Sequence, residues 1–105
     1  MKAKDKLALN EFSSRVKARF PQARIWAFGS RARDDARDDS DLDICVVLPG
    51  LDTSAWEEIS DMAWEVGFEH DLLITTVKFD EDAFERGAPS ESSLVKAILR
   101  EGVTA

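Results

Sequence analysis

The chain has 105 residues, of which 44% are hydrophobic and 33% are charged, a composition ordinary for a soluble globular protein of one domain. Its formal net charge of −7 disfavours broad, nonspecific binding to nucleic acid, which needs a basic surface. No apolar run approaches the roughly 20 residues of a membrane span. The lone Cys45 cannot form an internal disulfide, so we expect a cytoplasmic protein.

The first predicted element is an amphipathic helix over residues 5–19, which Pro21 ends. Its apolar residues recur at spacings of three and four, as one buried helix face requires: Leu9, Phe12, Val16 and Phe20. A short apolar run over residues 25–28 then predicts the first buried strand, over residues 24–28.

A turn and a charged segment follow this strand. Gly29 suits a turn that needs positive φ or a close backbone approach. Ser30 is expected near the N-cap of a short helix over residues 31–37, where free N–H groups and a hydroxyl would suit phosphate oxygens. Three arginines add candidate charge-assisted donors: Arg31, Arg33 and Arg37.

Two carboxylates open the second predicted strand, which Pro49 and Gly50 end. Asp41 and Asp43 are two apart, so they share one face of the strand with their Cα atoms roughly 6.6 Å apart. Hard divalent ions such as Mg²⁺ take carboxylates together with substrate phosphates. A pair of such ions about 3.5–4 Å apart can support an in-line phosphoryl or nucleotidyl displacement. For Ser30 to share the ligand, the first two strands should be antiparallel.

A crossover helix is predicted before the third strand. Ser54 and Glu57 form a capping-box pattern at its start, and Gly67 fits its C-terminal cap. Trp56 and Trp64 could stack on a base, but at helical spacing they are expected to be core residues.

The third strand, over about residues 70–77, has Asp71 at its head. A parallel pairing with the second strand would put Asp71 beside Asp41 and Asp43 and complete three carboxylates. His70, the only histidine, should then point to the opposite face, toward a helix.

The last part of the chain is predicted as a helix or turn over residues 80–86, a loop over 87–90 and a helix over 93–101 that Gly102 ends. A calcium loop is the competing interpretation of the acidic segment. An EF-hand loop starting at Asp39 would need Gly at its sixth position and Glu at its twelfth, and these positions hold other residues. We expect four acidic residues to be solvated: Asp34, Asp35, Asp38 and Asp39.

These residues carry a family resemblance. The pair Gly29-Ser30, ten further residues, and then Asp41-Leu42-Asp43 resemble the nucleotidyltransferase superfamily related to DNA polymerase β. The compact length and residues 29–33 are most similar to the minimal nucleotidyltransferases, the MNT antitoxins of HEPN/MNT toxin–antitoxin pairs, and residues 98–102 resemble their ending. The resemblance implies an α/β (α+β) palm fold, with a small mixed sheet of three to four strands and flanking helices, in one nucleotidyltransferase domain over residues 1–105.

The resemblance also implies roles. Asp41 and Asp43 would bind two Mg²⁺ ions, and Asp71 would bind one of them and help activate the attacking hydroxyl. The triphosphate of ATP would be held by Gly29 and Ser30, with Arg31 or Arg33 in support. The implied reaction is AMPylation, the transfer of AMP from ATP onto a hydroxyl of a partner protein, a HEPN-type toxin.

Two other functions stay open. The chain could be an antitoxin that neutralises its partner by contact alone, with a site that is vestigial or only binds ATP. It could also transfer a nucleotide to a small molecule such as an aminoglycoside. Related enzymes of that last type carry a further domain for the acceptor.

Overall fold

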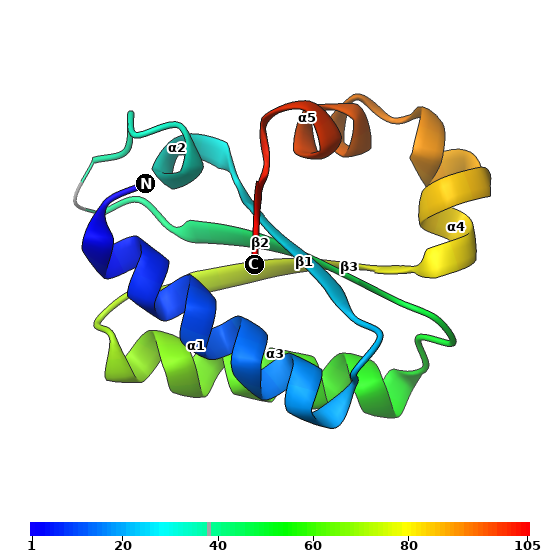
Figure 1. Cartoon of the computed structure of the whole chain (residues 1–105), viewed down its shortest axis with the longest axis horizontal. Coiled ribbons are helices and arrows are strands. Elements are labelled where there is room, and N and C mark those ends of the chain that lie inside the picture. The colour runs from blue at the N-terminus through cyan, green and yellow to red at the C-terminus, as the bar shows by residue number, and fades with distance from the viewer. Residues whose placement is uncertain (38) are drawn as a thin grey trace.

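The computed structural model describes residues 1–37 and 39–105. Its strands form one mixed sheet in the order β3-β2-β1-β4 (Figure 1). β1 (Arg24–Phe28) runs antiparallel to β2 (Leu42–Leu48) and to β4 (Val103–Thr104), whereas β3 (Ile74–Asp80) is parallel to β2. The mixed sheet, the antiparallel first pair and the parallel second pair are confirmed.

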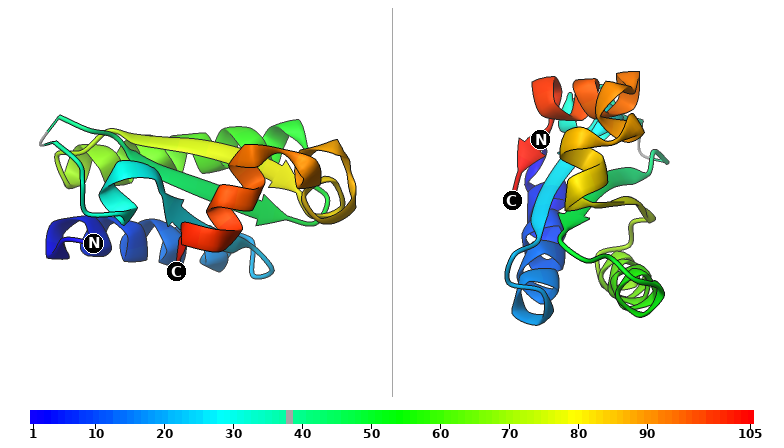
Figure 2. Two further views of the ribbon diagram at one scale, coloured as in Figure 1. Left: turned by 90° about the horizontal axis from the view of Figure 1, so that it is seen from above. Right: turned by 90° about the vertical axis from the view of Figure 1, so that its right-hand side faces the viewer.

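Helices cover both faces of the sheet, so that the sheet is the middle of three layers (Figure 2). One face carries α1 (Ala3–Arg19) and α3 (Thr53–Glu69), whose apolar stripes pack on the inward side chains of β1 and β2. Because both faces are covered, β2 is buried along almost its whole length, which explains its continuous apolar sequence.

The other face carries α4 (Glu81–Arg86), a short 3-10 helix (Ala88–Glu91) and α5 (Ser93–Glu101). Trp26 of β1 stacks on Phe84 of α4, with their ring centroids 5.4 Å apart. The rest of this second core cluster comes from β2 and α5: Cys45, Val47, Val95 and Ile98. None of the helices in the described part of the chain is long and apolar enough to cross a membrane.

The start of α3 differs from the prediction. The helix is capped by Asp52, whose carboxylate accepts a hydrogen bond from the Ala55 N–H at 2.8 Å. The predicted capping box at Ser54 is therefore wrong. Asp is as good an N-cap as Ser, and the sequence pattern does not choose between them.

The end of α3 also differs, and this difference matters for the site. Gly67 lies inside the helix and is buried, whereas the helix continues to Glu69. A Cβ on Gly67 would lie 2.5 Å from the Leu72 carbonyl oxygen, so glycine is needed for close approach of the returning chain. The predicted cap at Gly67 is wrong, and β3 consequently starts at Ile74.

The predicted last helix is confirmed, since α5 covers residues 93–101 and Gly102 follows it, whereas most of the predicted loop over residues 87–90 belongs to the 3-10 helix. Ser92 caps this helix by accepting from the Val95 N–H at 3.1 Å. The short β4 was not predicted because two residues carry no recognisable strand pattern. Val103 pairs with Ala27 and so closes the free edge of β1.

Candidate functional site

The junction between β1 and the next helix centres on Gly29. This residue opens α2 (Gly29–Ala32) with a φ of +77°, a conformation that side chains disfavour. A Cβ built on Gly29 would also overlap the Asp43 carboxylate oxygen Oδ2. Glycine is therefore required here twice, once for backbone conformation and once because a carboxylate occupies the adjacent space.

Asp43 reaches Gly29 because the two strands are antiparallel, with Phe28 paired to Asp43. Side chains alternate along β2, so Asp43 faces the same side of the sheet as Cys45, on the α2, α4 and α5 side. Its side chain is half-buried. Asp41 lies two residues earlier, just before β2 begins, and is also half-buried.

Thr75 is the residue that β3 places beside Asp43. The two residues are partners in the parallel pairing of β2 and β3. The Thr75 hydroxyl donates a hydrogen bond to Asp43 Oδ1 at 2.5 Å. Sequence reasoning missed Thr75, since a threonine in a strand is ordinary and only the register reveals its neighbour.

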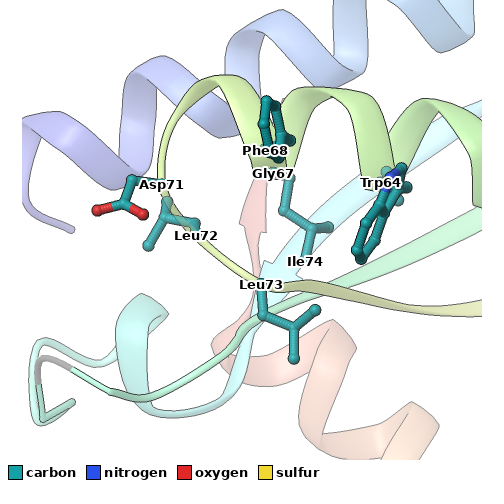
Figure 3. Close-up of a pocket in the computed structure, with 8 residues that line it drawn as sticks. Trp64, Gly67, Phe68, Asp71, Leu72, Leu73 and Ile74 are labelled. Carbon is teal, nitrogen blue, oxygen red and sulfur yellow. The ribbon is translucent and has the colours of Figure 1, made fainter.

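Asp71 does not take the predicted place. It is exposed in the turn between α3 and β3, with a φ of +55°. This turn leads from α3, whereas α2 lies on the opposite face of the sheet (Figures 1 and 3). Among the described residues, which omit Asp38, no group of three or more His, Cys, Asp or Glu side chains could hold a metal. Within the described residues, the structure therefore does not gather Asp71 with Asp41 and Asp43.

Asp71 lies away from Asp41 and Asp43 because α3 is longer than predicted. The prediction ended the helix at Gly67 and began the strand near His70, which put Asp71 level with the acidic pair. The helix instead runs two residues past Gly67, and Asp71 supplies the left-handed residue of the turn, a conformation that Asp tolerates better than most residues. The strand is therefore entered later, and Thr75 arrives opposite Asp43.

The helix after Gly29 is shorter than predicted. It ends at Ala32 rather than continuing through Arg37, because the chain leaves the helical conformation at Asp34, whose φ is +61°. Ser30 lies within the first turn of α2 and is half-buried, not at the N-cap, which is Phe28.

Arg31 is buried and engaged by protein groups. Its guanidinium pairs with the buried Asp5 carboxylate of α1 at 2.9 Å, and its Nε donates to the Ser40 carbonyl at 2.7 Å. These contacts tie α1, α2 and the segment before β2 together. Arg31 therefore has a structural role in this fold, and its predicted contact with the triphosphate stays a prediction.

Arg33 is the exposed arginine of this region that the structure brings near α5. Its Nε lies 3.2 Å from Asp35 Oδ2, and its Nη1 lies 4.0 Å from Glu101 Oε2. Arg37 is exposed as well. Asp34, Asp35 and Asp39 are exposed, as predicted, whereas Asp38 lies outside the described residues.

His70 faces a helix, which confirms that prediction. Its Nε2 lies 2.6 Å from the Glu11 carboxylate of α1. This hydrogen bond is the main reason why the pKa of Glu11 lies below its usual value. His70 therefore contributes to packing between α1 and the end of α3 and takes no part in the acidic site.

The tryptophans of α3 are not core residues. Trp56 and Trp64 are 49% and 68% exposed, which contradicts the prediction. Trp64 and Phe68 border a hollow of about 430 Å³ together with Asp71 and Leu73 (Figure 3). Because α3 covers the face of the sheet opposite Asp43, this hollow is separate from the acidic site.

The site thus consists of a glycine-serine turn, two carboxylates and one hydroxyl at the end of the sheet where β1 leaves and β2 and β3 enter. Carboxylate and hydroxyl oxygens are hard donors, suited to Mg²⁺ or Ca²⁺ and not to soft metals. A backbone turn next to such an ion is suited to phosphate oxygens.

A family model described as nucleotidyltransferase domain matches residues 9–103 of the chain. No curated protein gives a significant match. Three similar solved structures are toxin–antitoxin complexes, and their identities of 21–23% show a shared fold.

The first of these structures is a toxin–antitoxin with AMP-PNP, with a TM-score of 0.59, 23% identity, and coverage of 90% of this chain and 69% of that chain. The second is a mutant MntA-HpeT toxin–antitoxin, with a TM-score of 0.56, 21% identity, and coverage of 90% of this chain and 69% of that chain. The third is the tri-AMPylated Shewanella oneidensis HEPN toxin in complex with MNT antitoxin. Its TM-score is 0.55 and its identity 22%, with coverage of 95% of this chain and 70% of that chain.

Proposed function

Because the chain belongs to the nucleotidyltransferase domain family, we propose that it is a Mg²⁺-dependent nucleotidyltransferase that moves AMP from ATP onto a hydroxyl of a partner protein. The observation that carries the proposal is the close approach of the Asp43 carboxylate to the Gly29 backbone. It brings a carboxylate oxygen, suited to a metal ion, and a backbone turn, suited to phosphate, to one point, as the binding of a nucleotide complexed with Mg²⁺ would require.

The residues present fit one Mg²⁺ ion. The space that a side chain at position 29 would fill is occupied by a carboxylate oxygen, so the carboxylate lies directly against backbone. Asp41 and Asp43 would hold the ion, with phosphate oxygens and water as the remaining ligands. When bound, Mg²⁺ would neutralise charge on the phosphates and polarise the phosphorus that is attacked.

The other residues would bind and orient the nucleotide. We propose that the Gly29 backbone and the Ser30 hydroxyl bind the triphosphate. The Arg33 guanidinium would offset its negative charge from the solvent side. The acceptor oxygen forms a bond to the α-phosphorus, the bond from this phosphorus to the bridging oxygen breaks, and pyrophosphate leaves. The acceptor proton goes to solvent or to a base that the partner supplies. In such reactions, positioning and charge neutralisation account for most of the rate.

A HEPN-type toxin is the partner that we propose. Support comes from two of the structural relatives, one a toxin–antitoxin with AMP-PNP and the other an MNT antitoxin with its tri-AMPylated HEPN toxin. By analogy with these relatives, the chain would act as an antitoxin by AMPylating its toxin. A cytoplasmic location suits the buried, unpaired Cys45.

A second function is favoured by one observation, the threonine beside Asp43. A site with fewer carboxylates could bind ATP without transferring AMP, and the chain would then neutralise its partner by contact. Replacing both Asp41 and Asp43 with Asn separates the two functions, because a contact inhibitor would still neutralise the partner after this change.

The test of nucleotidyl transfer uses ATP labelled in turn at the α- and the γ-phosphate, with Mg²⁺, this chain and the protein encoded next to it. Transfer of the α-label and not the γ-label to the neighbour is the expected result. Transfer of the γ-label would identify a kinase instead. An unlabelled neighbour whose toxicity is nevertheless suppressed would support the contact function.

A further inference from the structure

The residue that faces Asp43 from the neighbouring parallel strand decides how many metal ligands the site has. That residue is Thr75, and its side chain is on the same face of the sheet as Val77 and Phe79, which pack against the α4–α5 cluster. Asp43 and Thr75 therefore project from adjacent strands into the same space, and they touch through a hydrogen bond of 2.5 Å.

A carboxylate at this position would have been the third ligand of a two-ion site. A pair of ions about 3.5–4 Å apart needs ligands for each ion, and two carboxylates with phosphates and water satisfy one octahedral ion. Asp71 does not supply the missing ligand, since it lies in the exposed turn after α3. Within residues 1–37 and 39–105, no third acidic side chain joins the pair.

We propose that Thr75 sets the stoichiometry of the site: this chain binds ATP with one divalent ion, and Thr75 orients Asp43 toward that ion instead of binding a second one. The inference rests on the proposed function and refines it. The Thr75 hydroxyl occupies Oδ1 of Asp43, and the missing side chain of Gly29 leaves room for Oδ2. The carboxylate is thus held from two sides in one orientation.

This arrangement has a consequence for the reaction. A second ion would bring the acceptor hydroxyl and its proton under the control of this chain. With one ion, the chain contributes the bound nucleotide, and the base that receives the acceptor proton belongs to the partner or is water. Thr75 is accordingly a positioning residue, since it acts through Asp43.

The stoichiometry can be measured without any reaction. Equilibrium dialysis with Mn²⁺ and the non-transferable analogue α,β-methylene-ATP gives the number of Mn²⁺ ions bound per bound nucleotide. The wild-type chain should bind one Mn²⁺ per nucleotide, and Thr75→Asp should bind close to two. A wild-type ratio of two would overturn the proposal, whether or not the Thr75→Asp variant folds.

The orienting role is tested by removing only the hydroxyl. Thr75→Val keeps the shape of the side chain and should weaken binding of the Mn²⁺–analogue complex roughly tenfold, with the ratio of one retained. Thr75→Ser should restore most of the affinity. The matched control is Thr76→Val, since the Thr76 hydroxyl accepts from Lys78 and takes no part in the site. Equal affinities of Thr75→Val and Thr76→Val would refute the orienting role.

Failure of this inference is distinguishable from failure of the proposed function. If the wild-type chain binds the analogue with two ions, the proposed function stands and the role of Thr75 falls. If the analogue binds equally well after Asp41 and Asp43 are both changed to Asn, the metal–nucleotide site itself is wrong, and both proposals fall.

Discussion

The carboxylate oxygen Oδ2 of Asp43 occupies the space that a side chain on Gly29 would need. The two residues come from different strands, and the antiparallel pairing of β1 and β2 brings them together. The glycine of the turn and the second aspartate of the pair thus form one structural unit, although 14 positions separate them in the chain.

Gly29→Ala should therefore harm both stability and nucleotide binding. The matched control is Gly50→Ala, since Gly50 has a similar φ of +70° but nothing within 4 Å of a Cβ. Each change places an alanine in the left-handed region, which costs roughly 1–2 kcal/mol. Only Gly29→Ala should also displace Asp43 and reduce ATP affinity. Urea denaturation and calorimetric titration with Mg²⁺–ATP measure the two effects, and similar ATP affinities of the two variants would contradict the account.

The buried pair of Arg31 and Asp5 should be costly to break. Arg31→Met leaves the Asp5 carboxylate without this partner in a buried position, and loss of one partner of a buried pair typically costs about 3–5 kcal/mol. Arg31→Met combined with Asp5→Leu should cost less than the sum of the two single changes. Denaturant midpoints of the three variants measure this coupling, and additive losses would show that the pair contributes nothing specific.

Much of the fold was predictable because its signals are local. The helix at residues 93–101, the strand at 24–28 and the reversal of direction between the first two strands follow from apolar periodicity and from turn residues beside them. Gly29, Ser30, Asp41 and Asp43 could be selected because they lie close together along the chain.

The neighbour of Asp43 on β3 could not be predicted, because its position depends on how three elements fit together. Gly67 has the composition of a helix cap but serves as a close-packing position inside α3. Whether β3 brings Asp71 or Thr75 to Asp43 depends on where that helix ends, and no residue pattern states this. The pairing of Arg31 could not be predicted for a similar reason, since its partner Asp5 is 26 positions away.

The tryptophans should respond unequally to truncation. Trp64 is 68% exposed, so Trp64→Ala should change the free energy of unfolding by only about 0.5 kcal/mol or less. Trp26 is 9% exposed and stacks on Phe84, so Trp26→Ala should cost about 3–5 kcal/mol. Thermal and denaturant unfolding measure the stability of both variants. A large loss of stability for Trp64→Ala would mean that this side chain packs in the core.

Cys45 should be chemically silent in the folded protein. It is fully buried in β2, and burial raises the pKa of its thiol to about 12. At pH 8 only about one molecule in ten thousand would carry the reactive thiolate, before access is considered. A thiol-reactive dye should label the protein only after denaturation, and fast labelling of the native protein would contradict the buried position.

The central claim is that Asp41 and Asp43 bind the metal–nucleotide complex from which AMP is transferred. The most direct test is the rate of α-label transfer from ATP to the partner by wild type, Asp41→Asn, Asp43→Asn and, as a control at a solvated position, Asp39→Asn. Both site variants should lose about a hundredfold or more of the rate, since each removes a charge that the reaction needs, while their melting curves stay close to wild type. Asp39→Asn should keep the wild-type rate. Folded Asp41→Asn and Asp43→Asn variants that transfer label as fast as wild type would contradict the account.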